Sequence, residues 1–270
     1  MQLTRPAAVL STLILAGCYG LAGPSAPEAA APGSGGRGQG IDMATDASNV
    51  LGELKESRVD FVARYYRDPD SSWPPLSPRE AQLLSAQGLK IVAVYEYHSP
   101  DPAHFTYDAG YQDALTAYRQ ARAVGQPPGS AIYFAADFHA QGDAVGSVID
   151  YFHGVDAGLS AASSGAPYAV GVYGSGVVCA AVKRAGLAQY TWLSNSITWD
   201  DSTDYADWNI MQGAALQGLS FDNDANQARN DYGAFQVSGS SAAPSFDAGP
   251  VPPPVPQEQS STSVSVIPSR

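Results

Sequence analysis

The stretch that decides the fold is AIYFAAD, residues 131–137, an uncharged run that ends at the carboxylate of Asp137. A continuous apolar run of this kind is typical of a parallel strand that is covered on both faces. In a barrel of parallel strands, all strands end at one rim, and active sites form there. The run therefore predicts an acidic side chain at a barrel rim. The alternative is a strand that simply reaches solvent at Asp137.

Seven further strand-like runs follow along the chain: GIDM (40–43), VDFVARYY (59–66), LKIVAVYEY (89–97), YAVGVYG (168–174), YTWLSN (190–195), WNIMQG (208–213) and LSFDND (219–224). The earlier runs are separated by helix signals, such as the capping box with proline at residues 77–80. Strands alternating with helices predict an α/β fold, a small (β/α)8 TIM-like barrel. The last two intervals are short, so the late helices are expected to be reduced.

A doubly wound open sheet is the alternative to the barrel. It is less consistent with the sequence because no glycine-rich phosphate-binding motif follows the first strand-like run. The chain also has no P-loop and no His-Glu-x-x-His motif. Its 14 basic and 26 acidic residues sum to a net charge of −12, which argues against nucleic-acid binding. The missing motifs predict that the protein needs no cofactor, and we expect it to be a monomer.

The N-terminal residues carry an export signal. One basic residue, Arg5, precedes an apolar run at 7–16, which is too short to span a bilayer and suits a signal peptide. The run ends in LAGC at 15–18, which resembles the bacterial lipoprotein box and implies that Cys18 is lipidated. An ordinary cleaved signal or an unprocessed buried segment is the alternative. We expect an exported lipoprotein, anchored to a membrane on its extracytoplasmic side.

Composition then divides the chain into four parts. These are a lipoprotein signal peptide (1–18), a disordered Ala/Pro/Gly linker (19–38), a folded barrel (39–237) and a disordered Pro/Ser-rich tail (238–270). Cys179 lies in an apolar helical stretch of the folded part and is predicted to be a buried free thiol.

Acidic side chains recur at the predicted strand ends, at Asp42, Glu96, Asp137 and Asp222. Glycoside hydrolysis needs two carboxyl groups across the scissile bond, one protonated and one ionised. Asp137 is the first candidate for the general acid, because the uncharged run before it buries its backbone. Glu96, Asp42 and Asp222 are candidates for the second carboxylate. The alternative roles are structural: Asp42 as a helix cap or a partner of Arg64, Asp222 as a turn residue, and Glu96 as a solvated strand end.

Aromatic and polar side chains accompany these acids. Tyr95, Tyr173 and Trp192 are candidates for sugar-stacking walls, and Arg64 and Gln212 for residues that orient the substrate or the acids. His98 and His139 each follow one of the acids by two residues, which raises the possibility of a metal site. Both histidines lie beyond the expected strand ends and no third histidine joins them, so no metal is predicted.

Taken in order, the motifs resemble one known family. They are GIDMA (40–44), VARYY (62–66), SPREAQLLSAQGLKIVAVYE (77–96), AIYFAADFHA (131–140), VGVYGSG (170–176), TWLSNS (191–196) and FDNDAN (221–226). Residues 40–237 resemble the bacterial exported glycoside hydrolase-like domain, a family of unknown function. That family is similar to the glycoside hydrolase family 25 muramidases, TIM-barrel enzymes that cut peptidoglycan. The resemblance implies a site for peptidoglycan or another envelope polysaccharide.

The resemblance also implies roles for individual residues. In the muramidases the fourth strand ends in Asp-x-Glu, and the matching triplet here is Ala135-Ala136-Asp137. The position of the acid keeps a carboxylate at Asp137, whereas the preceding acidic position is occupied by Ala135. The first-strand and last-strand acids match Asp42 and Asp222. The sequence therefore leaves three hypotheses: a glycosidase, a glycan-binding pseudoenzyme, and an envelope interaction scaffold.

Overall fold

The computed structural model describes residues 37–68, 70–163, 168–199 and 204–238. The predicted signal peptide with Cys18, nearly all of the predicted linker and nearly all of the predicted tail lie outside these ranges. No helix within them is long and apolar enough to cross a membrane.

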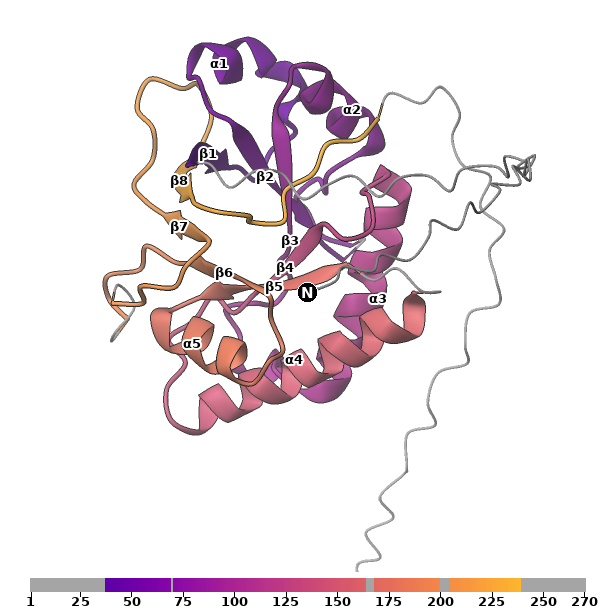
Figure 1. Ribbon diagram of the computed structural model, residues 1–270, viewed down its shortest axis with the longest axis vertical. Helices are drawn as coiled ribbons and strands as arrows, with labels where there is room; N and C mark the ends of the chain where they lie inside the picture. The colour runs from indigo at the N-terminus through magenta and orange to yellow at the C-terminus, as the bar shows by residue number, and fades with distance from the viewer. Residues whose placement is uncertain (1–36, 69, 164–167, 200–203, 239–270) are drawn as a thin grey trace, which may run out of the picture.

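Eight strands close into a barrel in chain order (Figure 1). They are β1 (Gly38–Asp42), β2 (Phe61–Tyr66), β3 (Lys90–Tyr95), β4 (Ala131–Ala135), β5 (Ala169–Gly174), β6 (Tyr190–Leu193), β7 (Ile210–Gln212) and β8 (Asp224–Ala228). The predicted barrel is confirmed, and the open sheet is excluded because β1 pairs with β8.

One strand runs against the others. Strands β1 to β7 pair in parallel, whereas β8 is antiparallel to both of its neighbours, with Asp42 of β1 opposite Asp224. The predicted strand at 219–224 is therefore wrong, since that segment is a turn and β8 begins where the prediction ended. The connection between β7 and β8, residues 213–223, is too short for the crossover that a parallel strand needs.

Helices cover one part of the barrel. They are α1 (Leu51–Glu56), α2 (Pro78–Ala86), α3 (Tyr107–Val124), α4 (Asp143–Ala162) and α5 (Gly176–Arg184), with short 3-10 turns η1 (Ala47–Asn49) and η2 (Pro102–His104). Beyond α5 the described residues form no helix, as expected for reduced late helices. The side of the barrel that holds β7 and β8 carries loops instead (Figure 1).

Local sequence explains how the helices begin and pack. Ser77 caps α2, where its hydroxyl accepts a hydrogen bond from the amide of Glu80 at 3.1 Å. Glycine at position 154 lets α4 approach α3, because a Cβ there would lie 2.9 Å from the backbone nitrogen of Tyr111. The resulting two-helix layer covers the outer face of the central strands (Figure 1).

The barrel interior is filled by aromatic side chains. Phe61, Tyr133, Tyr190 and Trp192 form one cluster with small inward residues such as Ala63 and Ala135. Glycine 171 is required beside Tyr133, because a Cβ at that position would lie 2.4 Å from the ring. The middle of the barrel is therefore a packed core, and the ends of the parallel strands surround an open space at the rim.

Candidate active site

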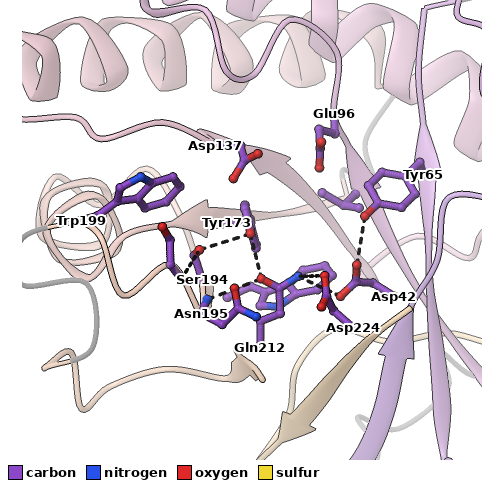
Figure 2. A pocket seen from close by; sticks show the side chains of 13 residues that line it. Asp42, Tyr65, Glu96, Asp137, Tyr173, Ser194, Asn195, Trp199, Gln212 and Asp224 are labelled. Carbon is purple, nitrogen blue, oxygen red and sulfur yellow. Dashed lines mark hydrogen bonds between the residues drawn. The ribbon is translucent and has the colours of Figure 1, made fainter. Parts of the chain in front are cut away.

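A cavity of about 380 Å³ opens at the rim where β1 to β7 end and β8 begins (Figure 2). Each strand contributes at least one side chain to it, from its last two residues or the segment just beyond in β1 to β7 and from its first residue in β8. The lining residues are Asp42, Tyr65, Val94, Glu96, Asp137, Tyr173, Trp192, Ser194, Asn195, Ser196, Trp199, Gln212 and Asp224. Four of them are acidic, and the polar groups point into the cavity from all around the barrel (Figure 2).

Strand alternation places the acids in the cavity. On β4 the inward residues are Tyr133 and Ala135, so Asp137, two residues on, continues the inward series. Val94 on β3 precedes Glu96 in the same way. The backbone amide of Asp137 donates to the carbonyl of Ser99 at 3.1 Å, which joins the segment after β4 to the loop after β3. The two acids are therefore held by neighbouring, directly bonded segments.

Asp42 is fixed by three hydrogen bonds. Its carboxylate accepts from the Tyr65 hydroxyl at 3.1 Å, from the Gln212 amide at 3.0 Å and from the Asn226 amide at 2.7 Å. Burial raises the pKa of Asp42 to about 6, against the lowering effect of these donors, and the nearby charge of Asp224 adds to the rise. At neutral pH Asp42 is thus mainly ionised and held in one orientation.

Glu96 and Asp137 form the second acidic group. Burial, then repulsion from Asp137, raises the pKa of Glu96 to about 8, although the positive charge of Arg67 opposes the rise. The pKa of Asp137 is also raised, chiefly by burial. Like charges that are close cannot both ionise cheaply, so ionisation of Asp137 favours the protonated form of Glu96. Figure 2 shows these two carboxyl groups on one side of the cavity and Asp42 and Asp224 on the other.

A hydrogen-bonded floor connects the two sides. The Tyr173 hydroxyl donates to the Gln212 side chain at 2.9 Å, and Gln212 donates in turn to Asp42. Trp192 is 1% exposed and donates from its indole nitrogen to Asn226 at 2.8 Å. Its ring packs edge-on against Tyr173, with centroids 5.3 Å apart. Trp192 is therefore part of the floor beneath the ligand space.

The sequence of the folded part decides the family. Residues 52–243 match the sequence model described as the Rv2525c-like, glycoside hydrolase-like domain, over most of the chain. The chain belongs to this Rv2525c-like family. The resemblance inferred from the motifs is thereby confirmed.

Two curated relatives of similar sequence come from Bacillus subtilis (strain 168). The chain is 30% identical over 183 residues to the uncharacterized protein YbfG, across 63% of this chain and 25% of YbfG. It is 28% identical over 166 residues to the uncharacterized protein FadG, across 60% of this chain and 29% of FadG. The chain thus spans between a quarter and a third of the length of these relatives.

Solved structures show the same fold. The Mycobacterium tuberculosis Tat-secreted protein Rv2525c, in complex with HEPES, matches with a TM-score of 0.61 and 23% identity over 73% of this chain and 98% of that one. An uncharacterized B. stearothermophilus protein matches with a TM-score of 0.52 and 16% identity over 70% of this chain and 95% of that one. The Rv2525c-like barrel of this chain is thus a known architecture.

Within this Rv2525c-like barrel, six of the nine residues predicted for the site line the cavity: Asp42, Glu96, Asp137, Tyr173, Trp192 and Gln212. The other three, Arg64, Tyr95 and Asp222, do not. Trp192 lines the cavity as its floor, so it was wrongly predicted to be a sugar-stacking wall. Trp199, which the prediction missed, lies at the side of the cavity and is only partly buried (Figure 2).

Arg64 faces away from the cavity. Its guanidinium is completely buried behind β2 and pairs with Glu80 of α2, with Nε and Oε1 2.5 Å apart. It also donates to the carbonyl of Met43 at 2.8 Å. The prediction of a substrate-orienting role was wrong because adjacent strand residues face opposite sides, and on β2 it is Tyr65 that faces inward.

Tyr95 and Asp222 were wrongly predicted for related reasons. Tyr95 directly precedes Glu96, so it faces the helix layer, where its ring packs 5.9 Å from that of Phe134. Asp222 is exposed in the turn before β8, and Asp224 occupies the cavity instead. Since β8 is antiparallel, its first residue, and not its last, lies at the rim.

Sequence reasoning missed Asn226 because β8 has no hydrophobic signature. Its inward residues are polar where they meet the site, and its outward residues, such as Gln227, are exposed because no described helix covers them. Alternation counted backwards from Ala228 would have found both Asn226 and Asp224. No group of three or more His, Cys, Asp or Glu residues in the described ranges is arranged to hold a metal ion.

Proposed function

We propose that the protein is a glycoside hydrolase of the cell envelope, acting on peptidoglycan or another envelope polysaccharide. The observation that carries this proposal is the pair Glu96 and Asp137, two acids that line one open cavity, where burial raises both pKa values and the charge of Asp137 raises that of Glu96 further. Environments that push the pKa values of neighbouring carboxyl groups apart are typical of acid and base partners. The resemblance to muramidases suggests the substrate class.

The roles follow from the environments of the two acids. Glu96, with a pKa of about 8, is protonated at neutral pH and donates its proton to the glycosidic oxygen as the bond to the anomeric carbon breaks. Asp137 is the ionised partner, which stabilises the positive charge that develops on the sugar or activates the incoming water. This assignment reverses the roles expected from sequence, where Asp137 was the first candidate for the acid.

Asp42 and the aromatic residues support this chemistry. Asp42 already accepts three hydrogen bonds, so it is placed as a fixed negative charge opposite the reacting pair. Trp199 offers a partly exposed ring at the side of the cavity for stacking on a sugar. We further propose that the protein is exported and anchored through a lipid on Cys18, which would place the barrel beside its substrate.

Ala135 favours a second candidate function, glycan binding without cleavage. This residue stands where the muramidases keep an additional acid, and it is 3% exposed within the barrel core. A site that lacks this carboxylate can still hold a glycan through its remaining polar groups. Glu96, which directly follows the neighbouring strand β3, could replace the missing acid. Cleavage that depends on Glu96 therefore distinguishes hydrolysis from binding alone.

Digestion of purified peptidoglycan by the mature protein tests the proposal. We expect soluble fragments with new reducing ends, and a loss of about 10²–10⁴-fold in rate for Glu96→Gln and for Asp137→Asn. Asp150→Asn, which changes an exposed acid on α4, is the matched control and should keep full activity. Release that is unaffected by both site variants contradicts the assigned roles, and binding without release supports the second candidate.

The pH profile gives an independent test. Activity requires Glu96 protonated and Asp137 ionised, so the rate should fall above about pH 8, where Glu96 loses its proton. It should also fall at acidic pH, where Asp137 gains one, at a pH higher than an ordinary aspartate would give. A rate that keeps rising well beyond pH 8 contradicts the role of Glu96 as the donor.

A further inference from the structure

The end of the barrel opposite the cavity carries most of the exposed basic side chains. The parallel strands begin at this end and the helices finish there, and we call it the base. It consists of the last turn of each helix with the loop that follows, the start of β1, residues 207–209 before β7 and residues 229–233 after β8. Among the exposed basic residues of the described ranges, only Arg79 and Arg119 lie elsewhere. Those in the base are Arg37, Lys55, Arg58, Lys90, Arg122 and Arg184.

Acidic side chains are fewer at the base, and two of them are engaged in hydrogen bonds. The acids in the described segments of the base are Glu56, Asp60, Asp207 and Asp231. Asp60 accepts from the backbone amide of Gln39 at 2.8 Å, and Asp231 accepts from the Tyr190 hydroxyl at 2.8 Å. No ion pair among the described residues joins a basic residue of the base to a carboxylate. The base is therefore positive, although the chain has a net charge of −12.

Helix dipoles account for only part of this excess. Basic residues in the last turn of a helix complement the negative end of its dipole, which explains those at the ends of α1, α3 and α5. Arg37, Arg58 and Lys90 lie on no helix. The pairing of β1 with β8, extended by one residue, sets Arg37 opposite Arg229. Like charges that are directly opposite in a sheet are destabilising, so this arrangement calls for a negative partner.

A hollow of about 460 Å³ lies where these two arginines meet, on the outer face of β8 and β1. The guanidinium carbon of Arg229 lies 3.9 Å from the ring centroid of Trp208, and its nitrogens donate to two backbone carbonyls, so its charge is fixed. Arg37, Gln39 and Gln227 line the same hollow with exposed side chains. The hollow thus offers cations, amide groups and an aromatic ring, and no carboxylate lines it.

We propose that the base is a membrane-docking surface, which binds the phosphate headgroups of anionic phospholipids and turns the cavity away from the bilayer. Basic side chains are attracted to an anionic leaflet, and tryptophan rings such as that of Trp208 are typical of the headgroup region. The described chain begins at Arg37, and residues 19–36 connect the base to Cys18, the proposed site of lipidation. A basic patch strengthens a lipid anchor.

Distance explains how a chain of net charge −12 can bind a negative surface. At about 0.1 M salt the interaction between exposed charges decays over about 10 Å. Strand β2 has six residues, and at about 3.3 Å per residue it separates the base from the rim by about 15–20 Å. Headgroups that contact the base therefore interact mainly with its cations, whereas the acids of the cavity are screened. Repulsion of the acidic rim favours the same orientation.

Flotation of the protein with phospholipid vesicles tests this inference. The protein is residues 18–270 with Cys18→Ser, which cannot be acylated, so that binding does not come from a lipid anchor. The vesicles contain either phosphatidylcholine alone or equal parts of phosphatidylcholine and phosphatidylglycerol. We expect the anionic vesicles to bind about tenfold or more tightly than the neutral ones, and this preference to weaken as salt is raised.

Variants of equal charge locate the contact. Arg37→Gln/Lys90→Gln should weaken binding to the anionic vesicles about 25-fold, because each basic side chain near an anionic surface contributes about fivefold. The matched control is Arg79→Gln/Arg119→Gln, which removes the same charge outside the base and should change binding less than about twofold. Arg58→Asn tests a position outside the hollow, where the φ of 58° suits asparagine, and should weaken binding about fivefold.

Each contrary outcome overturns the inference. Equal weakening in the base and control variants would show that net charge alone governs binding. Equal binding to the two kinds of vesicle, or binding to neither, would show that the base does not recognise anionic headgroups. Linear inorganic polyphosphate, added at the same phosphate concentration, is the competitor, and tighter binding to it than to vesicles would assign the base to a soluble phosphate polymer. None of these measurements depends on hydrolysis at the cavity, so the inference and the proposed function fail separately.

Discussion

Two buried polar clusters lie on opposite faces of the barrel wall. The outer cluster pairs each charge with an opposite charge, whereas the cavity cluster holds acids without such a partner in the described part of the chain. The outer cluster is Arg64 with Glu80: the guanidinium donates to both carboxylate oxygens and to two backbone carbonyls, and Glu80 also accepts from the amide of Ala47. The cavity cluster is Asp42, Glu96 and Asp137, whose pKa values are all raised chiefly by burial. No cation within the described residues forms an ion pair with them.

The difference separates structural charge from charge that is available for chemistry. In the outer cluster each charge is paired with the opposite charge and held by further hydrogen bonds. In the cavity cluster the protein holds acids in an environment that raises their pKa values, a feature that is common among acids that transfer protons. Unfavourable burial of this kind lowers stability and is a common feature of active sites.

The largest effect is expected from breaking the outer cluster. Arg64→Met should lower the free energy of unfolding by about 3–5 kcal/mol, because Glu80 is left buried without its cation. The double variant Arg64→Met/Glu80→Met should recover most of that loss, since no charge remains buried. Urea denaturation of both variants measures this, and a single variant as stable as the wild type would show that the pair contributes little.

Removing a cavity charge should instead raise the free energy of unfolding. The folded pKa of Glu96, about 8, lies above the ordinary value of 4.5, so the wild type binds an extra proton when folded and loses stability as pH rises between these values. Glu96→Gln removes this loss and should stabilise the protein by about 1–2 kcal/mol above pH 8, an amount limited by the partial exposure of Glu96.

The difference between Glu96→Gln and wild type should shrink toward zero near pH 4, where both folded and unfolded states of the wild type are protonated. Thermal unfolding across this pH range measures it. An advantage of Glu96→Gln that is independent of pH would show that the effect comes from packing and not from titration.

The last comparison is between two adjacent tyrosines on the two faces of β2, where each variant loses a single hydroxyl group. The Tyr66 hydroxyl is completely buried and donates to Gln126 at 2.8 Å, so Tyr66→Phe should cost about 1–3 kcal/mol of stability and leave activity intact. Tyr65→Phe removes one donor from Asp42 and should cost only about 0.5–1.5 kcal/mol. It should also raise the pKa of Asp42, so that the fixed negative charge opposite the reacting pair, and with it part of the activity, is lost at a higher pH than in the wild type.

Equal activity and equal pH profiles for the two phenylalanine variants would contradict the division between outer and cavity clusters. Urea denaturation and the initial rate on peptidoglycan, measured on the same preparations, provide both readouts.

The sequence by itself determined the first seven strands, their order and the acids Asp42, Glu96 and Asp137 at or just beyond the ends of three of them. An apolar run such as residues 131–137 and a capping box such as residues 77–80 are local patterns, and strand alternation with helices leads from them to the barrel. Asp42, Glu96 and Asp137 could be found because each follows an apolar run, and the burial of Cys179 because it lies on an apolar helix.

Only the tertiary structure decided which way each side chain faces and what it meets. On β2 either Arg64 or Tyr65 could face the cavity, and after β3 either Tyr95 or Glu96 could. The choice depends on how each strand is rotated about its axis, which packing against the helix layer sets. The reversal of β8, which replaces Asp222 by Asp224 at the rim, follows from closure of the barrel. The effect of Asp137 on the pKa of Glu96 depends on the separation in space of segments that follow two different strands, and no local sequence pattern encodes that separation.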